Sequence, residues 1–199
     1  MNYCAVIADI VNSKLIADRS QVKQEMKTAV NKINSDYQDA LAAEFMIYAG
    51  DEVQGLLATP SVSYKLITDL SSYFSSAQLV FGVGVGKVTT EIPSDPITWE
   101  LDGPAYHRAR KMIKQAKKKK PSICYSFGGE DNLAADRAAD LINSLLYFIG
   151  STVQNRTQRQ KEVAQLYNEY GSQEKVAAKL GITQPGVSRI LSKGFYPDV

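Results

Sequence analysis

Two aspartates lie where a pair of carboxylates could hold a metal ion. Asp9 lies near the end of an apolar run from Tyr3 to Ile10, and Asp51 lies in a turn between two further apolar runs. If the first run is a strand beside the hairpin that carries Asp51, the carboxylates meet at one end of a sheet. Mg²⁺ binds one or two protein carboxylates and completes its shell with phosphate oxygens. The pair predicts a Mg²⁺ or Mn²⁺ site, although helix capping by Asp9 and turn formation by Asp51 explain the same residues.

The residues that follow Asp9 suit a phosphate group. Asn12, Ser13 and Lys14 lie where the expected strand gives way to a turn and then a helix. Free backbone N–H groups at a helix start bind anions. We therefore predict that these three residues contact the phosphates of a ligand.

Three glycines alternate along another apolar run, at Gly82, Gly84 and Gly86. Alternate glycines leave one face of a strand without side chains. Close packing within the protein is one explanation, and approach of a ligand to the backbone is the other. The tandem spacing favours a close approach to the backbone.

Two basic segments follow these glycines. The first runs from Tyr106 to Lys111 and contains the one histidine, His107; it suits phosphate binding, or it forms a solvated helix face. The second is the lysine run Lys117–Lys120, whose simplest role is to complement a helix C-terminus while staying solvated. Contact of this run with polyphosphate or DNA is the second interpretation.

The segment from Gln173 to Ser192 has the pattern of a helix-turn-helix, which places a short helix in the major groove of DNA. Ala177 lies where two helices must approach closely, and Gly181 suits the left-handed residue that ends the first helix. The apolar stripe of the second helix comprises Val187, Ile190 and Leu191. The predicted DNA contacts are Thr183, which also caps that helix, Gln184, Ser188, Arg189 and Lys193. An ordinary helical hairpin and a protein-docking module are the alternatives.

These residues must be positioned by a mixed set of elements. The apolar periodicity predicts strands at 3–10, 44–48, 52–58, 79–89 and 122–127, and helices at 20–41, 63–74, 103–120 and 133–153. The strand-and-helix order is the ferredoxin-like plan. We predict an α+β domain at 1–130, a connector helix at 131–154 with a possible role in dimer contact, and a small all-α helix-turn-helix domain at 155–199.

Composition limits the class of protein. The 199 residues are 44% hydrophobic and 22% charged, with a net charge of +2. Residues 151–199 hold seven Lys or Arg and four Asp or Glu, so 7 − 4 gives that segment +3, which fits a small DNA reader. Cys4 and Cys124 lie far apart and there is one histidine, which excludes Cys/His zinc chemistry. Since no leader peptide and no apolar run of about 18 residues is visible, we expect a cytoplasmic protein without membrane spans.

Several motifs resemble a known family. The segments AVIADIVNSK, FMIYAGDEVQGLL, FGVGVGKV and DGPAYHRARKM are similar, in this order, to motifs of the class III nucleotidyl cyclases. A cyclase-like domain followed by a helix-turn-helix resembles the SatD family of bacterial proteins over the whole chain. The cyclase resemblance implies that Asp9 and Asp51 bind metal ions and that Ile10 offers a backbone carbonyl to them. It also implies that the active site forms between two chains, and hence a homodimer.

The resemblance weakens at the residues that would read a purine and stabilise a transition state. The positions of the purine-reading lysine and aspartate hold Ile47 and Glu100. The positions of the catalytic asparagine and arginine hold His107 and Lys111, with Arg108 nearby. A lysine lacks the bidentate fork with which an arginine binds phosphate. The resemblance thus leaves Glu100, Arg108 and Gly84 as candidate nucleotide contacts, and His107 and Lys111 as candidate catalytic residues.

Three functions fit these observations. The first is a DNA-binding regulator whose cyclase-like domain dimerises and senses a nucleotide. The second is an enzyme that acts on nucleoside triphosphates with Mg²⁺ or Mn²⁺ at Asp9 and Asp51. The third is a scaffold whose helix-turn-helix docks a protein. We favour the first, because Ile47 and Lys111 depart from the residues that a cyclase needs.

Overall fold

The computed structural model describes residues 2–16, 18–48, 50–119, 122–128 and 133–194 and separates into two compact units, Met1–Tyr147 and Phe148–Val199. The expected domain boundary at residue 130 lies outside the described residues, as does Lys120 of the lysine run. The expected connector corresponds to one helix, α4 (Leu133–Gln154), within which the division falls.

The first unit is built on a five-stranded sheet. Its strands are β1 (Tyr3–Ile10), β2 (Leu41–Tyr48), β3 (Glu52–Leu57), β4 (Leu79–Gly86) and β5 (Ile123–Ser126), in the order β2-β3-β1-β4-β5. Strand β1 runs antiparallel to both β3 and β4, and β5 is added parallel to β4. The register places Asp9 opposite Glu52, at the start of the hairpin strand that follows Asp51. The predicted neighbourhood of the first strand and the hairpin is therefore confirmed.

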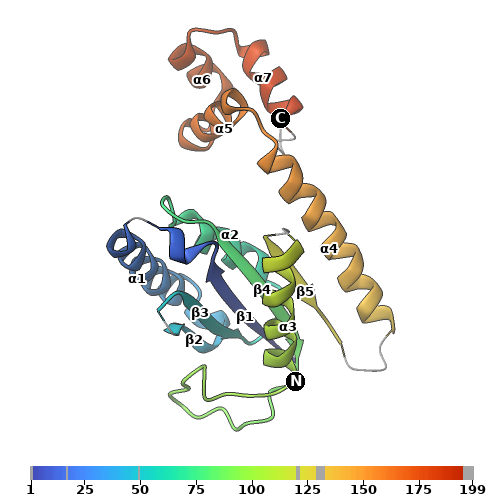
Figure 1. Cartoon of the computed structure of the whole chain (residues 1–199). Coiled ribbons are helices and arrows are strands. Elements are labelled where there is room, and N and C mark those ends of the chain that lie inside the picture. The colour runs from blue at the N-terminus through green and yellow to red at the C-terminus, as the bar shows by residue number, and fades with distance from the viewer. Residues whose placement is uncertain (1, 17, 49, 120–121, 129–132, 195–199) are drawn as a thin grey trace. The chain divides into compact units, whose positions relative to one another are not determined.

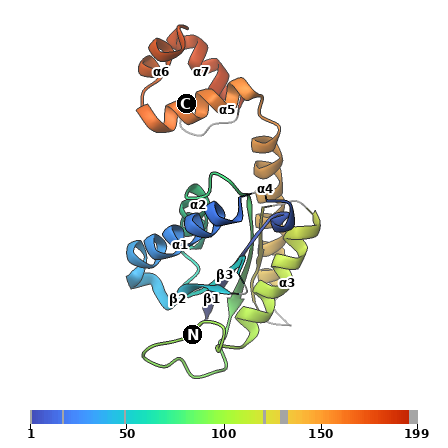
Figure 2. The same cartoon turned by 60° about the vertical axis from the view of Figure 1, so that its left-hand side comes forward.

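Helices cover both faces of this sheet (Figures 1 and 2). Helices α1 (Arg19–Asp36) and α2 (Ser63–Ser72) pack on the face that carries Val6, Ala8 and Ile10, and α3 (Pro104–Lys119) packs on the face that carries Ala5 and Ile7. Two short 3₁₀ turns, Ser13–Leu15 and Gln38–Ala40, precede α1 and β2. The mixed α+β fold predicted from the sequence is confirmed.

The boundary between the first long helix and the second strand differs from the prediction. The helix was expected to reach Leu41, but α1 ends at Asp36 and β2 already begins at Leu41. Leu41 and Ala43 pair with Leu57 and Leu56 of β3. Strand pairing thus overrides the helical preference of the Leu-Ala-Ala segment, because propensity is weaker than tertiary contact.

The alternate glycines of β4 are explained by packing. A Cβ atom on Gly82 would collide with the backbone of Ala109 and Ile113, and one on Gly84 with the backbone of Ala105 and Ala109. Helix α3 therefore covers the bare face of β4. The close approach predicted from the spacing is made by this helix, and Gly84 is in contact with it where a nucleotide was expected.

The second unit contains three helices, α5 (Gln158–Tyr170), α6 (Gln173–Leu180) and α7 (Gln184–Lys193). Their core comprises Val163, Ala164, Val176, Ala177, Val187 and Leu191. The hydroxyls of Thr157, Ser172 and Thr183 cap the three helix starts, and Gly171 and Gly181 adopt the left-handed conformation after α5 and α6. Among the described residues, the structure has no helix with the length and apolar character that membrane crossing requires.

Candidate functional site

Asp9 forms an ion pair with the far end of α3. Its side chain is 11% exposed, and its Oδ2 accepts a hydrogen bond from Nζ of Lys117. Burial raises the pKa of Asp9, and the hydrogen bond and charge of Lys117 act in the opposite direction. Lys117 lies near the end of α3 and its side chain stays 48% exposed, as the sequence predicts, but its ammonium also reaches a largely buried carboxylate, which the sequence did not predict.

A second ionic cluster lies opposite Asp9 on β3. Arg110 donates through Nη1 to Oε2 of Glu52 and through Nη2 to Oε1 of Gln54. The amide of Gln54 in turn donates to the carbonyl oxygen of Thr98, at 2.9 Å. Arg108, expected to contact a nucleotide, donates to the carbonyl oxygen of Val85 at 2.9 Å. Both arginines of the basic cluster therefore make contacts within the protein.

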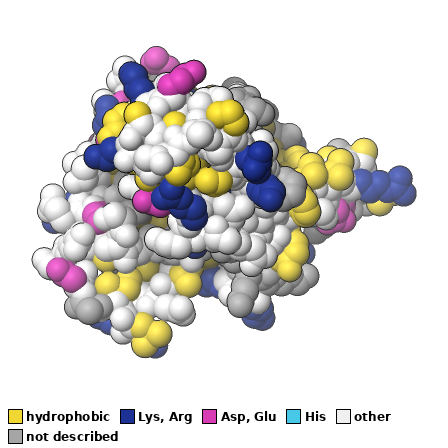
Figure 3. Space-filling view, turned by 90° about the horizontal axis from the view of Figure 1, so that it is seen from above, with side chains coloured by type: hydrophobic (Ala, Val, Ile, Leu, Met, Phe, Trp, Pro, Cys, Tyr) yellow, Lys and Arg dark blue, Asp and Glu magenta, His cyan; other side chains and the backbone are white. Residues whose placement is uncertain are grey.

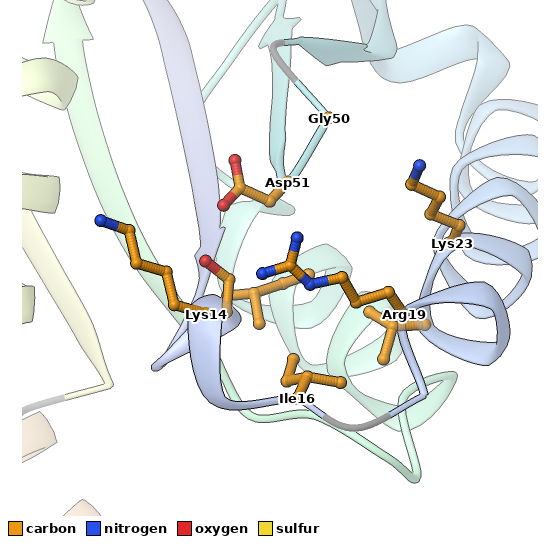
Figure 4. A pocket seen from close by; sticks show the side chains of 9 residues that line it. Lys14, Ile16, Arg19, Lys23, Gly50 and Asp51 are labelled. Atoms are coloured by element: carbon orange, nitrogen blue, oxygen red, sulfur yellow. The ribbon is translucent and has the colours of Figure 1, made fainter.

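A pocket of about 380 Å³ opens between the start of α1 and the tip of the β2–β3 hairpin (Figure 4). It is lined by Ile10, Ser13, Lys14, Ile16, Arg19, Val22, Lys23, Gly50 and Asp51. In the close-up, the Asp51 carboxylate and the Arg19 guanidinium point toward the same space. Three cationic residues, Lys14, Arg19 and Lys23, thus line the pocket with one carboxylate, and its positive surplus suits an anion.

The pocket is lined by four residues that the sequence predicts as ligand or metal contacts and by two basic residues that it did not predict. Ser13, Lys14, Ile10 and Asp51 were expected there, whereas Arg19 and Lys23 were not. These two basic residues are four positions apart at the start of a helix, so they lie on one face. That spacing, directly after a phosphate-suited turn, was a signal that could have identified them. Asn12 precedes the pocket in a left-handed conformation, with φ of 53°.

The two aspartates of the expected metal site face different parts of the first unit. Asp9 pairs with α3, whereas Asp51 lines the pocket beside α1. Asp51 is near enough to contribute to the raised pKa of Asp9. Among the described residues there is no group of three or more His, Cys, Asp or Glu suited to a metal ion. As the side chains lie, they do not fit a divalent ion bound by both aspartates and the Ile10 carbonyl, because Lys117 already neutralises Asp9.

The remaining candidate residues lie outside this pocket. His107 lines a second pocket of about 210 Å³ with Tyr48, Trp99 and Arg110, and its Nε2 lies 2.9 Å from Oδ1 of Asp102. The rings of Tyr48 and Trp99 approach with centroids 6.0 Å apart. Glu100 and Lys111 are exposed and line neither pocket. The structure therefore does not bring the expected catalytic residues next to Asp9 and Asp51.

Helix α7 exposes most of its expected DNA contacts. Thr183, Gln184, Arg189 and Lys193 are exposed, and Ser188 is half-buried. The Thr183 hydroxyl accepts from the backbone of Gly186 at 3.3 Å, and the Gln184 amide donates to Oε1 of Gln173 at 2.5 Å. On the face shown in Figure 3, lysine and arginine side chains lie in several separate groups. The hydrogen bond between Gln173 and Gln184 connects the starts of α6 and α7.

Comparisons with known proteins place this geometry in context. The model of the SatD family matches residues 3–195. No protein among the curated proteins matches the chain. A bacterial light-regulated adenylyl cyclase is 14% identical with a TM-score of 0.48, covering 63% of this chain and 75% of that one. A dimeric guanylyl cyclase domain of the RhoGC fusion protein from the aquatic fungus Blastocladiella emersonii is 16% identical with a TM-score of 0.45, covering 57% and 73%.

A further similar structure spans more of the chain. The regulator of polyketide synthase expression from Bifidobacterium adolescentis is 18% identical with a TM-score of 0.30, covering 96% of this chain and 74% of that one. At these identities and TM-scores, none of the three likenesses says what the present chain binds or does.

Proposed function

The chain belongs to the SatD family, and on that premise we propose that it is a cytoplasmic DNA-binding regulator of transcription with a phosphate-ligand sensor in its first unit. The DNA reader is the α6–turn–α7 segment. The ligand of the sensor is a nucleotide, bound at the pocket between α1 and the hairpin.

The exposed side of α7 is the observation that carries this proposal. Val187 and Leu191 bury one side of the helix, so Arg189 and Lys193 are left on the solvent side, and Gln184 is exposed as the first residue of the helix. Arginine and glutamine form bidentate hydrogen bonds with guanine and adenine in the major groove, and lysine neutralises phosphate. The bond between Gln173 and Gln184 restricts the rotamer of Gln184 before DNA arrives. An ordered side chain loses less entropy on binding.

The three cations of the pocket support the sensor. Lys14, Arg19 and Lys23 offset the single charge of Asp51 with a surplus of two positive charges. A nucleotide phosphate carries charge of the opposite sign, and its oxygens accept hydrogen bonds from lysine and arginine. By contrast, the position of Asp9 does not favour the alternative of a metal-dependent enzyme, since Lys117 already holds that carboxylate.

A DNA-selection experiment tests the proposal. The full chain is used to enrich duplexes from a random pool, and binding of the enriched and a scrambled duplex is compared by fluorescence anisotropy. Arg189→Ala is expected to weaken binding to the enriched site by about 1–3 kcal/mol and to relax base preference at one position. Arg159→Ala is the matched control, because Arg159 pairs with Glu162 on α5. Equal affinity of the wild type for enriched and scrambled duplexes would overturn the proposal.

A further inference from the structure

Helix α3 supplies positive charge to the carboxylates at one end of the sheet. Arg110 pairs with Glu52, and Lys117 pairs with Asp9. The two basic residues are seven positions apart, about two helical turns, so they lie on the same side of α3. Asp9 and Glu52 are directly opposite each other in the strand register. Two basic residues on one face of α3 therefore form ion pairs with two acidic residues on neighbouring strands.

The ion pair with Lys117 limits the binding of a metal ion by Asp9. A divalent ion at Asp9 would have to displace an ammonium that already donates a hydrogen bond to Oδ2. The Asp9 side chain is 11% exposed and that of Lys117 is 48% exposed, so the attraction in this partly buried pair is screened less than that in a fully exposed pair. Mg²⁺ also gives up its own water reluctantly. The ammonium and the ion thus compete for one carboxylate, and the ammonium is tethered beside it.

The neighbouring pocket does not need a metal ion to attract phosphate. Lys14, Arg19 and Lys23 line it with Asp51, and the Arg19 guanidinium points toward the space that the Asp51 carboxylate faces. In a site with few cationic side chains, a bound metal neutralises the phosphate charge. Here the protein supplies that charge from its own side chains.

We infer that Lys117 takes the place of a divalent cation at Asp9, so that the first unit binds its phosphate-bearing ligand without a divalent metal. The role of Lys117 follows from its ion pair with Asp9 alone, whereas metal-free binding of the ligand rests on the proposed sensor function. Separate experiments test the two, so that each can fail without the other.

Manganese binding tests the role of Lys117 without any nucleotide. Free Mn²⁺ is measured by electron paramagnetic resonance during titration of the full chain. Wild type and Lys114→Gln, the control at an exposed lysine one turn earlier on α3, are expected to bind no Mn²⁺ at Asp9. Lys117→Gln is expected to gain an Asp9-dependent site and to bind Mn²⁺ at least about tenfold more tightly than the background binding of the wild type, which corresponds to about 1.4 kcal/mol. The gain is expected to vanish in Lys117→Gln/Asp9→Asn.

Two results would overturn this role. One is Mn²⁺ binding by the wild type that Asp9→Asn removes, which would show that the ammonium does not exclude the ion. The other is a folded Lys117→Gln variant that gains no site. Circular dichroism and thermal melting show whether that variant is folded. Lys117→Arg, which keeps the positive charge, is expected to behave as the wild type.

Calorimetric titration of the wild type with ATP, GTP and inorganic pyrophosphate, in EDTA and in Mg²⁺, tests the ligand statement. The dissociation constant is expected to agree within about threefold between the two conditions, a difference of less than 1 kcal/mol. Binding that is about tenfold or more tighter in Mg²⁺ would overturn metal-free binding. No binding in either condition would instead overturn the proposed sensor, and the manganese titration would still decide the role of Lys117.

Discussion

At Asp9, burial and the charge of Lys117 act in opposite directions on one carboxyl group. Burial is the larger effect, so the pKa of Asp9 is raised. The folded state then holds a proton at pH values where the unfolded chain has lost it. Stability from this group is therefore greatest at acidic pH and falls as pH rises through the raised pKa.

The pH dependence of unfolding tests this balance. In urea denaturation between pH 4 and pH 7, the wild type is expected to lose free energy of unfolding with rising pH relative to Asp9→Asn, whose amide does not titrate. The difference between the two is expected to level off above the raised pKa. A wild type that gains free energy of unfolding relative to Asp9→Asn as pH rises would show that Lys117 outweighs burial. Glu162→Gln, on an exposed pair in α5, serves as the control for loss of one acid.

At the scale of elements, the sequence predicts the bounds of those helices and strands that depend on neighbouring residues alone. The run Tyr3–Ile10 became β1 with the predicted bounds, and Gly181 ends α6 in the left-handed conformation. The start of β2 was mispredicted because pairing with β3 determines it. The hydrogen bond between Asp9 and Lys117 joins residues 108 positions apart. Helical and strand periodicity relate only residues that are close in sequence, so they do not predict this pair. The sequence could therefore place Ser13 and Lys14 together within one turn, whereas it could not predict the partners that α3 supplies.

The contact between α3 and β4 gives a prediction at this scale. Gly84→Ala is expected to destabilise the first unit by about 1–3 kcal/mol or more, because the added methyl group collides with the α3 backbone. Gly150→Ala is the matched control, since nothing lies within 4 Å of a Cβ at that helical glycine. It is expected to stabilise α4 by about 0.5–1 kcal/mol. Urea denaturation measures both changes, and a neutral Gly84→Ala would refute the packing explanation.

For the whole molecule, the proposed function depends on a second copy of the chain. A short recognition helix reads few base pairs, and dimers reach specificity by binding two half-sites about one DNA turn apart. Helix α4 exposes Leu141 and Leu145, at 62% and 53%, one turn apart on the same face. Exposed leucines at that spacing are suited to contact a partner helix. We propose that the chain forms a homodimer through this face, with two recognition helices on a palindromic site.

Leu145→Glu is expected to break this dimer, because it would place a charge in an apolar contact. Analytical ultracentrifugation should then show a monomer, and affinity for a palindromic duplex should fall by about 100-fold while affinity for a half-site changes little. Leu15→Glu adds the same charge at another exposed leucine, outside α4, and should leave the dimer intact. A monomeric wild type that binds the palindrome no better than the half-site would instead mean that one recognition helix acts alone. The required specificity would then have to come from contacts beyond α7, because the exposed base-reading side chains of one such helix cover too few base pairs.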